Sequence, residues 1–206
     1  MIFNQTKNYQ FTTRMTLNDV NVEVVSQTKL LGTHITNDLK WDLNTKEITR
    51  KANARMQLLQ KAASFNPPKE DLKAIYITFI RSLLEQSCIV THSMLSQENK
   101  SDLERVQMSA LKIILKHEYI DYQHALNRLD MISLEERREN LCKHFAHKNV
   151  NNAVMKAHFE SNLKTHIMKT RNPELYDITF AHTQRLKNSP IIYMQRLLNE
   201  DTDNKL

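Results

Sequence analysis

The sequence has almost no glycine. Gly32 is the only one among 206 residues, and prolines number four. Tight turns and left-handed backbone positions usually recruit glycine, and the phosphate-binding loops of the common nucleotide-binding folds need several glycines at fixed spacing. The composition therefore argues against a sheet-rich barrel and against a glycine-loop nucleotide binder. It predicts a chain that is mostly helix.

Cysteine and long apolar runs are scarce as well. Cys88 and Cys142 are too few for a disulfide framework, which predicts a reducing, intracellular compartment. The longest apolar runs are far shorter than the ~20 residues that span a bilayer, and residues 1–3 are typical of a strand rather than of a signal peptide. We therefore expect no membrane association.

Positive charge is in moderate excess. The 29 lysines and arginines outnumber the 23 acidic residues, which gives a formal net charge of +6. This balance favours a polyanionic partner, although a solvated helical protein can have the same composition.

The first 41 residues have the character of short strands. Residues 11–17 alternate loosely, Asn18-Asp19 is a turn signal, and β-branched runs follow at residues 20–25 and 30–35. We predict a small antiparallel hairpin or a three-stranded ribbon. Gly32 falls within the last run, and a glycine inside a strand usually marks a bulge or a close approach by another backbone.

Helical spacing of apolar residues begins after Trp41, the only tryptophan. Asn44 and Glu47 can cap a first helix whose apolar stripe covers residues 48–63. Asn66-Pro67-Pro68 ends that helix, and the stripe of residues 72–84 predicts a second helix that faces the core along its whole length.

Further helices are predicted from Ser96, through residues 124–129, and from the capping box of residues 133–136. The periodicity weakens after residue 157, and residues 191–198 predict only a short last helix. The predicted fold is therefore mainly α, with a β-ribbon at residues 1–41, a helical bundle at residues 42–157 and a weakly structured tail at residues 158–206.

No catalytic constellation can be assembled from the sequence, so we predict no catalytic residue, metal ligand or cofactor. Two-metal catalysis needs clustered carboxylates, whereas Asp19, Asp38 and Asp42 lie singly in or beside predicted turns. Cys142 and His144 are two residues apart, which places them on roughly opposite sides of a helix. We expect a buried thiol at Cys142 and exposed imidazoles at His144 and His147.

The basic residues of the first predicted helix are better organised. Between residues 44 and 64 there is one acid, Glu47, and five cations that are predicted to form a ridge away from the apolar stripe: Lys46, Arg50, Lys51, Arg55 and Lys61. Such a ridge can follow phosphates without reading bases. The alternative is an ordinary solvated helix face.

A second basic group, Arg137-Arg138 with Lys143, lies close to several glutamates that can neutralise it. Its sequence context therefore favours a solvated or paired surface rather than a nucleic-acid site. The glutamates concerned are Glu135, Glu136 and Glu139.

Several blocks stand in a characteristic order: MIFN, MTLN, VVSQTKLLGTHITNDLKW, KANARMQLL, AIYITFIRSLLEQSCIV, LERVQMSALKIIL and SLEERRENLC. Together they resemble the region that follows the catalytic palm in reverse transcriptases of non-LTR (LINE-type) retrotransposons. The resemblance covers roughly residues 1–152, and the stretch RLKNSPIIYMQRLLN resembles the end of some such reading frames.

The resemblance implies roles that the spacing alone does not. In that family the block containing Leu31-Gly32 belongs to a hairpin that supports the primer strand, and the helices after it form a thumb that holds the template–primer duplex. It implies that Gly32 passes close to the palm or to nucleic acid. Trp41 would pack at the hinge between ribbon and thumb.

The sequence also departs from the family. The palm's aspartate pair and lysine block have no counterpart here, Leu30 replaces a common aromatic residue, and Thr91 stands where tryptophan is frequent. We therefore expect a truncated, reverse-transcriptase-derived protein without polymerase activity of its own. It is predicted to bind duplex nucleic acid, RNA–DNA or DNA, without sequence specificity, and a palm-containing chain is a further partner if the polymerase is split. The alternative is a non-functional structural remnant or a helical protein-interaction module.

Overall fold

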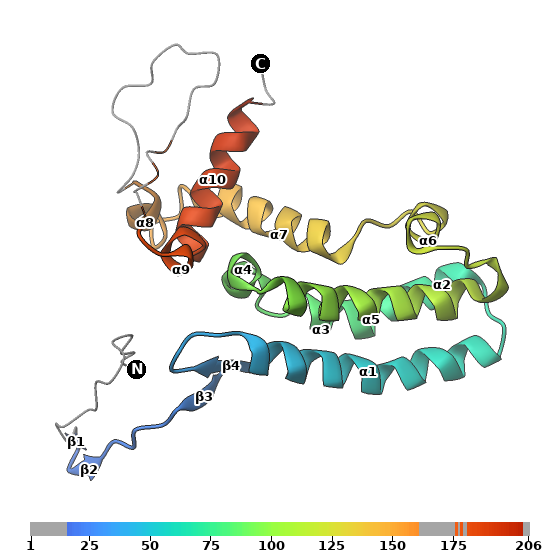
Figure 1. The fold of residues 1–206 in the computed structure, drawn as a ribbon, viewed down its shortest axis with the longest axis horizontal. Coiled ribbons are helices and arrows are strands. Elements are labelled where there is room, and N and C mark those ends of the chain that lie inside the picture. The colour runs from blue at the N-terminus through green and yellow to red at the C-terminus, as the bar shows by residue number, and fades with distance from the viewer. Residues whose placement is uncertain (1–15, 161–175, 177, 179–180, 204–206) are drawn as a thin grey trace.

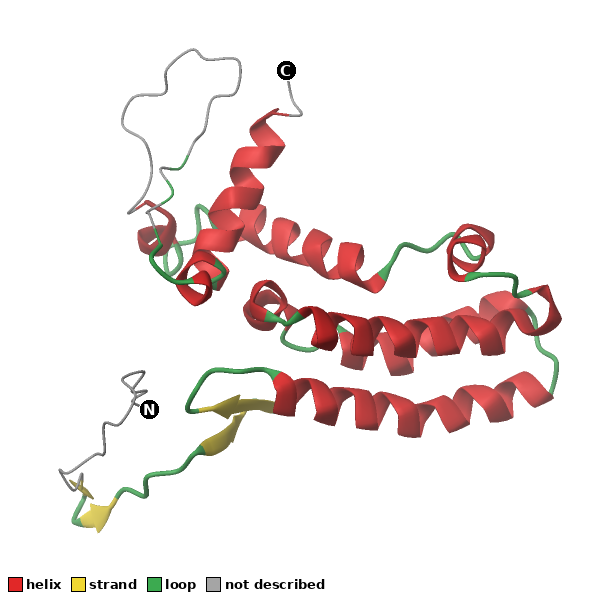
Figure 2. Cartoon of the chain, viewed as in Figure 1, coloured by secondary structure: helices red, strands yellow, loops and turns green. Residues whose placement is uncertain are grey.

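The computed structural model describes residues 16–160, 176, 178 and 181–203. Two small antiparallel sheets lie near the N-terminal end and are followed by helices (Figures 1 and 2). This arrangement confirms the prediction of a mainly α fold with an N-terminal β-ribbon. The strand predicted at residues 1–3, and most of the alternating segment at 11–17, lie outside the described residues.

Each sheet is a single hairpin closed by a two-residue turn. β1 (Thr16–Leu17) pairs with β2 (Val20–Asn21), and β3 (Gln27–Leu30) pairs with β4 (Thr33–Thr36) so that Leu30 faces Thr33. The turn residues all have positive φ: 50° and 63° at Asn18-Asp19, and 48° and 83° at Leu31-Gly32. Two positive φ angles are characteristic of the type I′ turn, whose twist matches that of the flanking strands.

The prediction that Gly32 lies inside a strand is therefore wrong. Gly32 is the second turn residue of the β3–β4 hairpin, and its φ of 83° is the conformation that other residues rarely adopt. A Cβ at this position would also lie 2.7 Å from Nε2 of Gln86. The close neighbour is thus a side chain of the same protein, and the backbone angle explains the glycine.

The first helix, α1 (Asp42–Ser64), is joined to β4 by side chains at their junction. Trp41 is buried beside the start of α1, as expected of a packing residue, whereas the hinge to a thumb stays a prediction. The predicted cap at Asn44 is wrong, because Asn44 lies within the helix and is buried. Its Oδ1 instead accepts a hydrogen bond from the backbone N–H of His34, at 3.1 Å, and so ties β4 to α1.

The second predicted helix is continuous but changes its winding. α2 (Lys69–Ile75) runs into a π-helical segment, η1 (Tyr76–Arg81), and then into α3 (Ser82–Leu84). Side chains spaced strictly four residues apart shift gradually around the axis of an α-helix. The π-helical segment has more residues per turn and compensates for this shift. Leu72, Tyr76, Ile80 and Leu84 all stay buried, whereas Phe79, predicted as core, is 50% exposed.

Short elements and two long helices complete the main bundle. They are α4 (Cys88–Thr91), the 3-10 turn η2 (His92–Met94), α5 (Gln97–Leu115), the 3-10 turn η3 (Lys116–Glu118), α6 (Tyr122–Arg128) and α7 (Leu134–Asn149). The predicted helix start at Ser96 and the predicted cap at Ser133 are confirmed, since each hydroxyl accepts a backbone N–H three residues on, at 3.2 Å.

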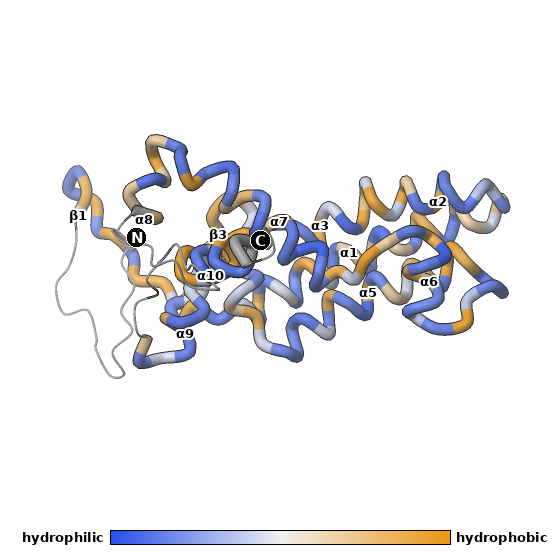
Figure 3. Tube along the Cα trace, turned by 90° about the horizontal axis from the view of Figure 1, so that it is seen from above, coloured by the Kyte–Doolittle hydropathy of each residue, from blue (hydrophilic) through white to orange (hydrophobic). Residues whose placement is uncertain are grey.

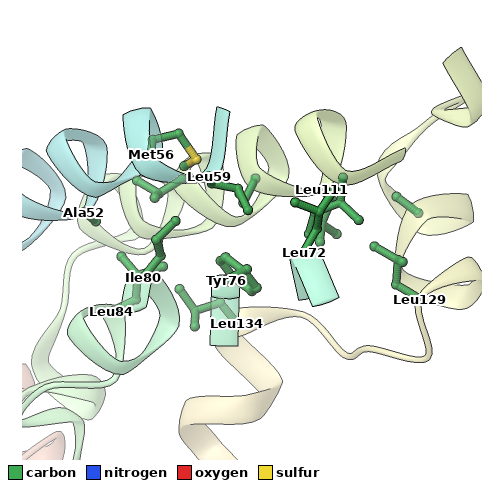
Figure 4. Close-up of a cluster of buried hydrophobic side chains, with 14 of the residues drawn as sticks. Ala52, Met56, Leu59, Leu72, Tyr76, Ile80, Leu84, Leu111, Leu129 and Leu134 are labelled. Carbon is green, nitrogen blue, oxygen red and sulfur yellow. The ribbon is translucent and has the colours of Figure 1, made fainter. Parts of the chain in front are cut away.

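The main hydrophobic core lies between α1, the helix of residues 69–84, α5, α6 and the start of α7 (Figure 4). The long helices are amphipathic, and apolar and polar residues alternate along them in Figure 3. Among the described residues, no helix is both long and apolar enough to span a bilayer.

A smaller second core involves two of the C-terminal helices, α8 (Lys156–Glu160) and α10 (Pro190–Asp203). The short helix between them, α9 (Gln184–Lys187), has no buried residue. α10 packs on α7, and the core contains Ala146, Phe159, Tyr176, Met194 and Leu198. The expected short helix at residues 191–198 is thus a 14-residue helix with a buried face. The expectation of weak structure does not hold for this part of the tail.

We expect Gly32→Val to lower the free energy of unfolding by about 1–3 kcal/mol, because valine is strained at positive φ. Gly32→Asn should cost less than about 1 kcal/mol, since asparagine tolerates left-handed conformations. Urea denaturation followed by Trp41 fluorescence compares the two variants. Equal stability of Gly32→Val and the unmodified chain would contradict the turn explanation.

Candidate nucleic-acid interface

The outer face of α1 carries three of the five predicted cations. Successive helix residues are rotated by about 100°, so Lys46, Arg50 and Lys61 fall within about 60° of one another. All three are exposed. Lys46 and Lys61 are fifteen positions apart, or about 22 Å along the helix axis. We call this surface, defined by Lys46, Arg50 and Lys61, the outer face.

Glu47 partly neutralises the outer face. Its two carboxylate oxygens accept from Nε and Nη2 of Arg50 at 2.9 and 3.0 Å, and Nζ of Lys51 lies 3.3 Å away. The hydrogen bonds from Arg50, followed by those from Lys51, lower the pKa of Glu47 to about 2. Glu47 is thus an anion at any pH near neutrality, and it also holds the Arg50 guanidinium in place.

Lys51 and Arg55 do not share the outer face, which corrects the prediction of a single ridge. They are rotated by about 140° and 180° from Lys46. Lys51 is half-buried. The Nη1 atom of Arg55 donates to the carbonyl oxygen of Phe79 at 2.6 Å, within the π-helical segment. Arg55 therefore joins α1 to the second helix and is not a free phosphate ligand.

The predicted primer-supporting pair is not brought together with the outer face. Gly32 lies against Gln86, and the hydroxyl of the adjacent Thr33 hydrogen-bonds that of Ser87. The hairpin is tied to α1 through Asn44, which is about 200° around the helix from Lys46. Leu31 projects from the hairpin tip with 94% of its surface exposed.

Sequence reasoning missed three amide side chains on the outer face. Asn53, Gln57 and Gln60 are exposed and lie within about 40° of Lys46 around the helix. Asparagine and glutamine side chains commonly contact phosphate and sugar oxygens. The sequence does contain these residues at the three- and four-residue intervals of one helix face. They are missed when only charged residues are considered.

Two members of the second basic group are paired with acids, and only one of these acids is a predicted partner. Lys143 pairs with Glu139 at 3.1 Å. Arg137 pairs instead with Glu85 at 3.0 Å, a residue 52 positions away that no local pattern identifies. The third member, Arg138, is buried.

No metal or catalytic centre emerges from the described part of the chain. Cys142 is buried whereas His144 and His147 are exposed, as predicted. No group of three or more histidine, cysteine or acidic side chains among the described residues could hold a metal ion. Asp38 stabilises its own turn through Thr36 and the N–H of Lys40, and Asp42 accepts from Asn99 at 2.7 Å.

One group of buried polar side chains lies where α7 meets the end of α3 and α4. Arg138 donates to the carbonyl of Leu84 and, at 3.1 Å, to Oγ1 of Thr91. Thr91, the position where the resemblance leads one to expect tryptophan, is thus a buried polar contact. His92 is buried beside them, with its ring edge-on to Tyr193 at 6.0 Å between centroids.

Burial, reinforced by the positive charge of Arg138 and then of Lys100, lowers the pKa of His92 to about 4. The imidazole is therefore neutral in the folded protein at pH 7 and remains so well below the ordinary histidine pKa of about 6.5.

Comparison with known proteins does not assign the chain to a family. No protein-family model matches it, and no curated protein or solved structure matches it either. The resemblance to reverse transcriptases therefore rests on the order of the sequence blocks alone.

The lowered pKa of His92 predicts acid-sensitive stability. The unfolded chain takes up a proton below about pH 6.5, whereas the folded chain does not until about pH 4. Stability should be full above pH 6.5 and should fall as the pH drops through this window, by about 2 kcal/mol between pH 7 and pH 5.

Urea denaturation at both pH values measures this loss. His92→Phe should abolish most of it, whereas His144→Phe, which changes an exposed histidine, should not. An equal loss of stability in the unmodified chain and in His92→Phe would show that another group is responsible.

Proposed function

We propose that the outer face of α1 binds the phosphate backbone of duplex nucleic acid, RNA–DNA or DNA, without sequence specificity. The observation that carries this proposal is the exposure of Lys46, Arg50 and Lys61 along about 22 Å of one helix face. Asn53, Gln57 and Gln60 lie between and beside these cations and add neutral hydrogen-bonding groups.

The chemistry of this face favours backbone contacts over base reading. Lysine and arginine that neutralise phosphates release counterions, which supplies affinity for any sequence. Sequence readout requires side chains that enter a groove in a fixed arrangement. The Arg50 guanidinium, the group best suited to a bidentate contact with a base, is already held by Glu47.

We further propose that the chain derives from the region after the palm in a non-LTR reverse transcriptase. The order of the sequence blocks supports this origin, as does a mainly helical fold that follows a small β-ribbon. On this proposal the protein lacks polymerase activity of its own, Leu31-Gly32 corresponds to the primer-supporting hairpin, and a palm-containing chain is a further partner. The alternative hypothesis is that the protein is a structural remnant without nucleic-acid function.

Binding to a short duplex should weaken steeply with salt and should depend little on sequence. Two phosphate contacts, from Lys46 and Lys61, predict a log–log slope of about −1.8 for duplex DNA, and a third contact from Arg50, if Arg50 leaves Glu47, brings the slope to about −2.7. Lys61→Ala should reduce the slope by about 0.9 for every duplex tested. Arg55→Ala should leave the slope unchanged, because Arg55 is occupied by the Phe79 carbonyl. Fluorescence anisotropy at several salt concentrations measures each slope.

Lys112→Ala is the matched control, because Lys112 is an exposed lysine on α5 and its removal changes the net charge equally. If Lys112→Ala and Lys61→Ala weaken binding equally, the attraction is due to net charge and the outer face is not a site. If the unmodified chain does not bind at about 50 mM salt, where phosphate contacts are strong, the remnant reading is correct.

The purified protein should not extend a primer on an RNA template when magnesium and nucleotides are supplied. Nucleotide addition needs carboxylates that hold a metal pair beside the primer hydroxyl, and the sequence has no Asp-Asp pair. Denaturing gel electrophoresis of a labelled primer tests this. Extension that co-purifies with the protein through successive columns would overturn this part of the proposal.

A further inference from the structure

The N-terminal ribbon exposes an apolar face that its sequence is patterned to bury. Residues 20–24 read Val-Asn-Val-Glu-Val, the alternation of a strand with one apolar and one polar side. Leu17 faces Val20 across the β1–β2 hairpin and so shares the apolar side. The exposed fractions of Leu17, Val20, Val22 and Val24 are 70, 68, 52 and 72%.

The backbone of this segment also has an open edge. In a two-residue hairpin the residues that flank the turn exchange hydrogen bonds, so Val20 points its N–H and C=O toward β1. The same groups of Asn21 then point the opposite way. β2 ends at Asn21 and residues 22–25 lie outside any strand, so Glu23 adds its backbone groups to this edge when the strand is extended by pairing. Among the described residues neither of them has a backbone partner outside the β1–β2 ladder. An open edge beside an exposed apolar face is the arrangement that recruits another strand.

We propose that this edge pairs with the same segment of a second copy of the chain, antiparallel about a two-fold axis at Val22. Val22 then faces its own counterpart, and Val20 faces Val24 of the other copy. On the opposite side Asn21 faces Glu23, so an amide meets a carboxylate and no like charges meet. The register is self-complementary, as an isologous two-fold interface requires.

The alternation of hydrogen bonds selects the same register. With residues 22–24 drawn into the strand conformation of β2, Asn21 and Glu23 become hydrogen-bonded pairs with each other across the two-fold axis. Val22 and its counterpart become a non-hydrogen-bonded pair, in which the side chains approach most closely. A two-fold axis at Glu23 would instead oppose two carboxylates, and a shift by one residue would oppose valine with a polar side chain.

The dimer is independent of the proposed nucleic-acid site, because it involves the ribbon and not the outer face of α1. The interface is small, so we expect weak association of the kind seen for interfaces below the standard size. Sedimentation velocity of the full chain, over concentrations up to its solubility limit, should show a monomer–dimer equilibrium.

Val22→Lys should weaken this association about tenfold or more, because it opposes two ammonium groups at the axis. Val154→Lys is the matched control, since Val154 is an exposed valine outside the ribbon, and it should have no effect. A chain that remains monomeric at all concentrations, whether the face is bare or covered from within the same chain, overturns the proposal. So does a dimer that Val22→Lys leaves intact.

Cysteine cross-linking tests the register separately and captures a weak dimer. Val22→Cys places two thiols opposite each other at a spacing that a disulfide can bridge, so air oxidation should give a covalent dimer on a non-reducing gel. Val20→Cys, which faces Val24 of the other copy, should not, and the native Cys88 and Cys142 are buried in both variants. Equal cross-linking of the two variants would overturn the register, and its absence from both would overturn the strand pairing.

Discussion

The carbonyl groups at the helix ends must be satisfied almost without glycine, and much of the structure depends on how this is done. Helices commonly end with a left-handed glycine whose geometry satisfies the last carbonyls. Here cations from distant segments share that role with backbone N–H groups such as those of Phe65 and Asn66, which bond to the carbonyls of Ala62 and Ala63. Nζ of Lys116 donates to the carbonyl of Ala63 near the end of α1 at 2.6 Å, and Arg138 donates to the carbonyl of Leu84, at the end of α3. Lys73 binds the carbonyl of Leu129, just after α6.

The same scarcity of glycine places other residues in left-handed conformations. Asn66, Ser87, Lys116 and Asp130 all have φ between 46° and 55°, each at a junction between helical elements. Asparagine and aspartate tolerate this region at low cost, while the other residues are strained unless packing holds them. Lys116 shows how this works, because its Nζ contacts Ala63 and Asn66 while its own backbone turns the chain between α5 and η3. The chain can thus change direction sharply between helices without glycine, because side-chain contacts stabilise the left-handed residues.

A buried polar network then fixes how the helices meet. Gln107 of α5 accepts from the hydroxyl of Tyr76 at 2.7 Å and donates to that of Tyr122 at 2.8 Å. Glu104, one turn earlier, accepts from Tyr122 and from the first N–H groups of α7, those of Leu134 and Glu135 at 2.9 and 3.0 Å. Desolvation raises the pKa of Tyr122, so its hydroxyl remains a donor at any pH of interest. One turn of α5 therefore orients the second helix, α6 and α7 together.

Sequence reasoning recovers what local spacing encodes and misses what distant contacts decide. The helix start at Ser96, the cap at Ser133, the turn at Asn18-Asp19 and the start of α1 after Trp41 all follow from residues within a few positions of one another. Asn44 has the composition of a cap, but its amide is used by His34 ten residues earlier. On the candidate site, the five cations of α1 are equivalent in sequence, and only the contact with Phe79 distinguishes Arg55 from Lys61.

These contacts change how the net charge of +6 should be interpreted. The cations that bind helix carbonyls are structural: Lys73, Lys116, Arg138, Arg55 and, near the end of α9, Arg196. Their charges remain, but each uses at least one donor on a carbonyl of the chain itself, and Arg138 is buried altogether. The excess of basic residues thus partly reflects a shortage of glycine rather than an affinity for polyanions. What remains as evidence for a nucleic-acid site is the position of Lys46, Arg50 and Lys61 on one exposed helix face, since only Arg50 of the three has an acidic partner among the described residues.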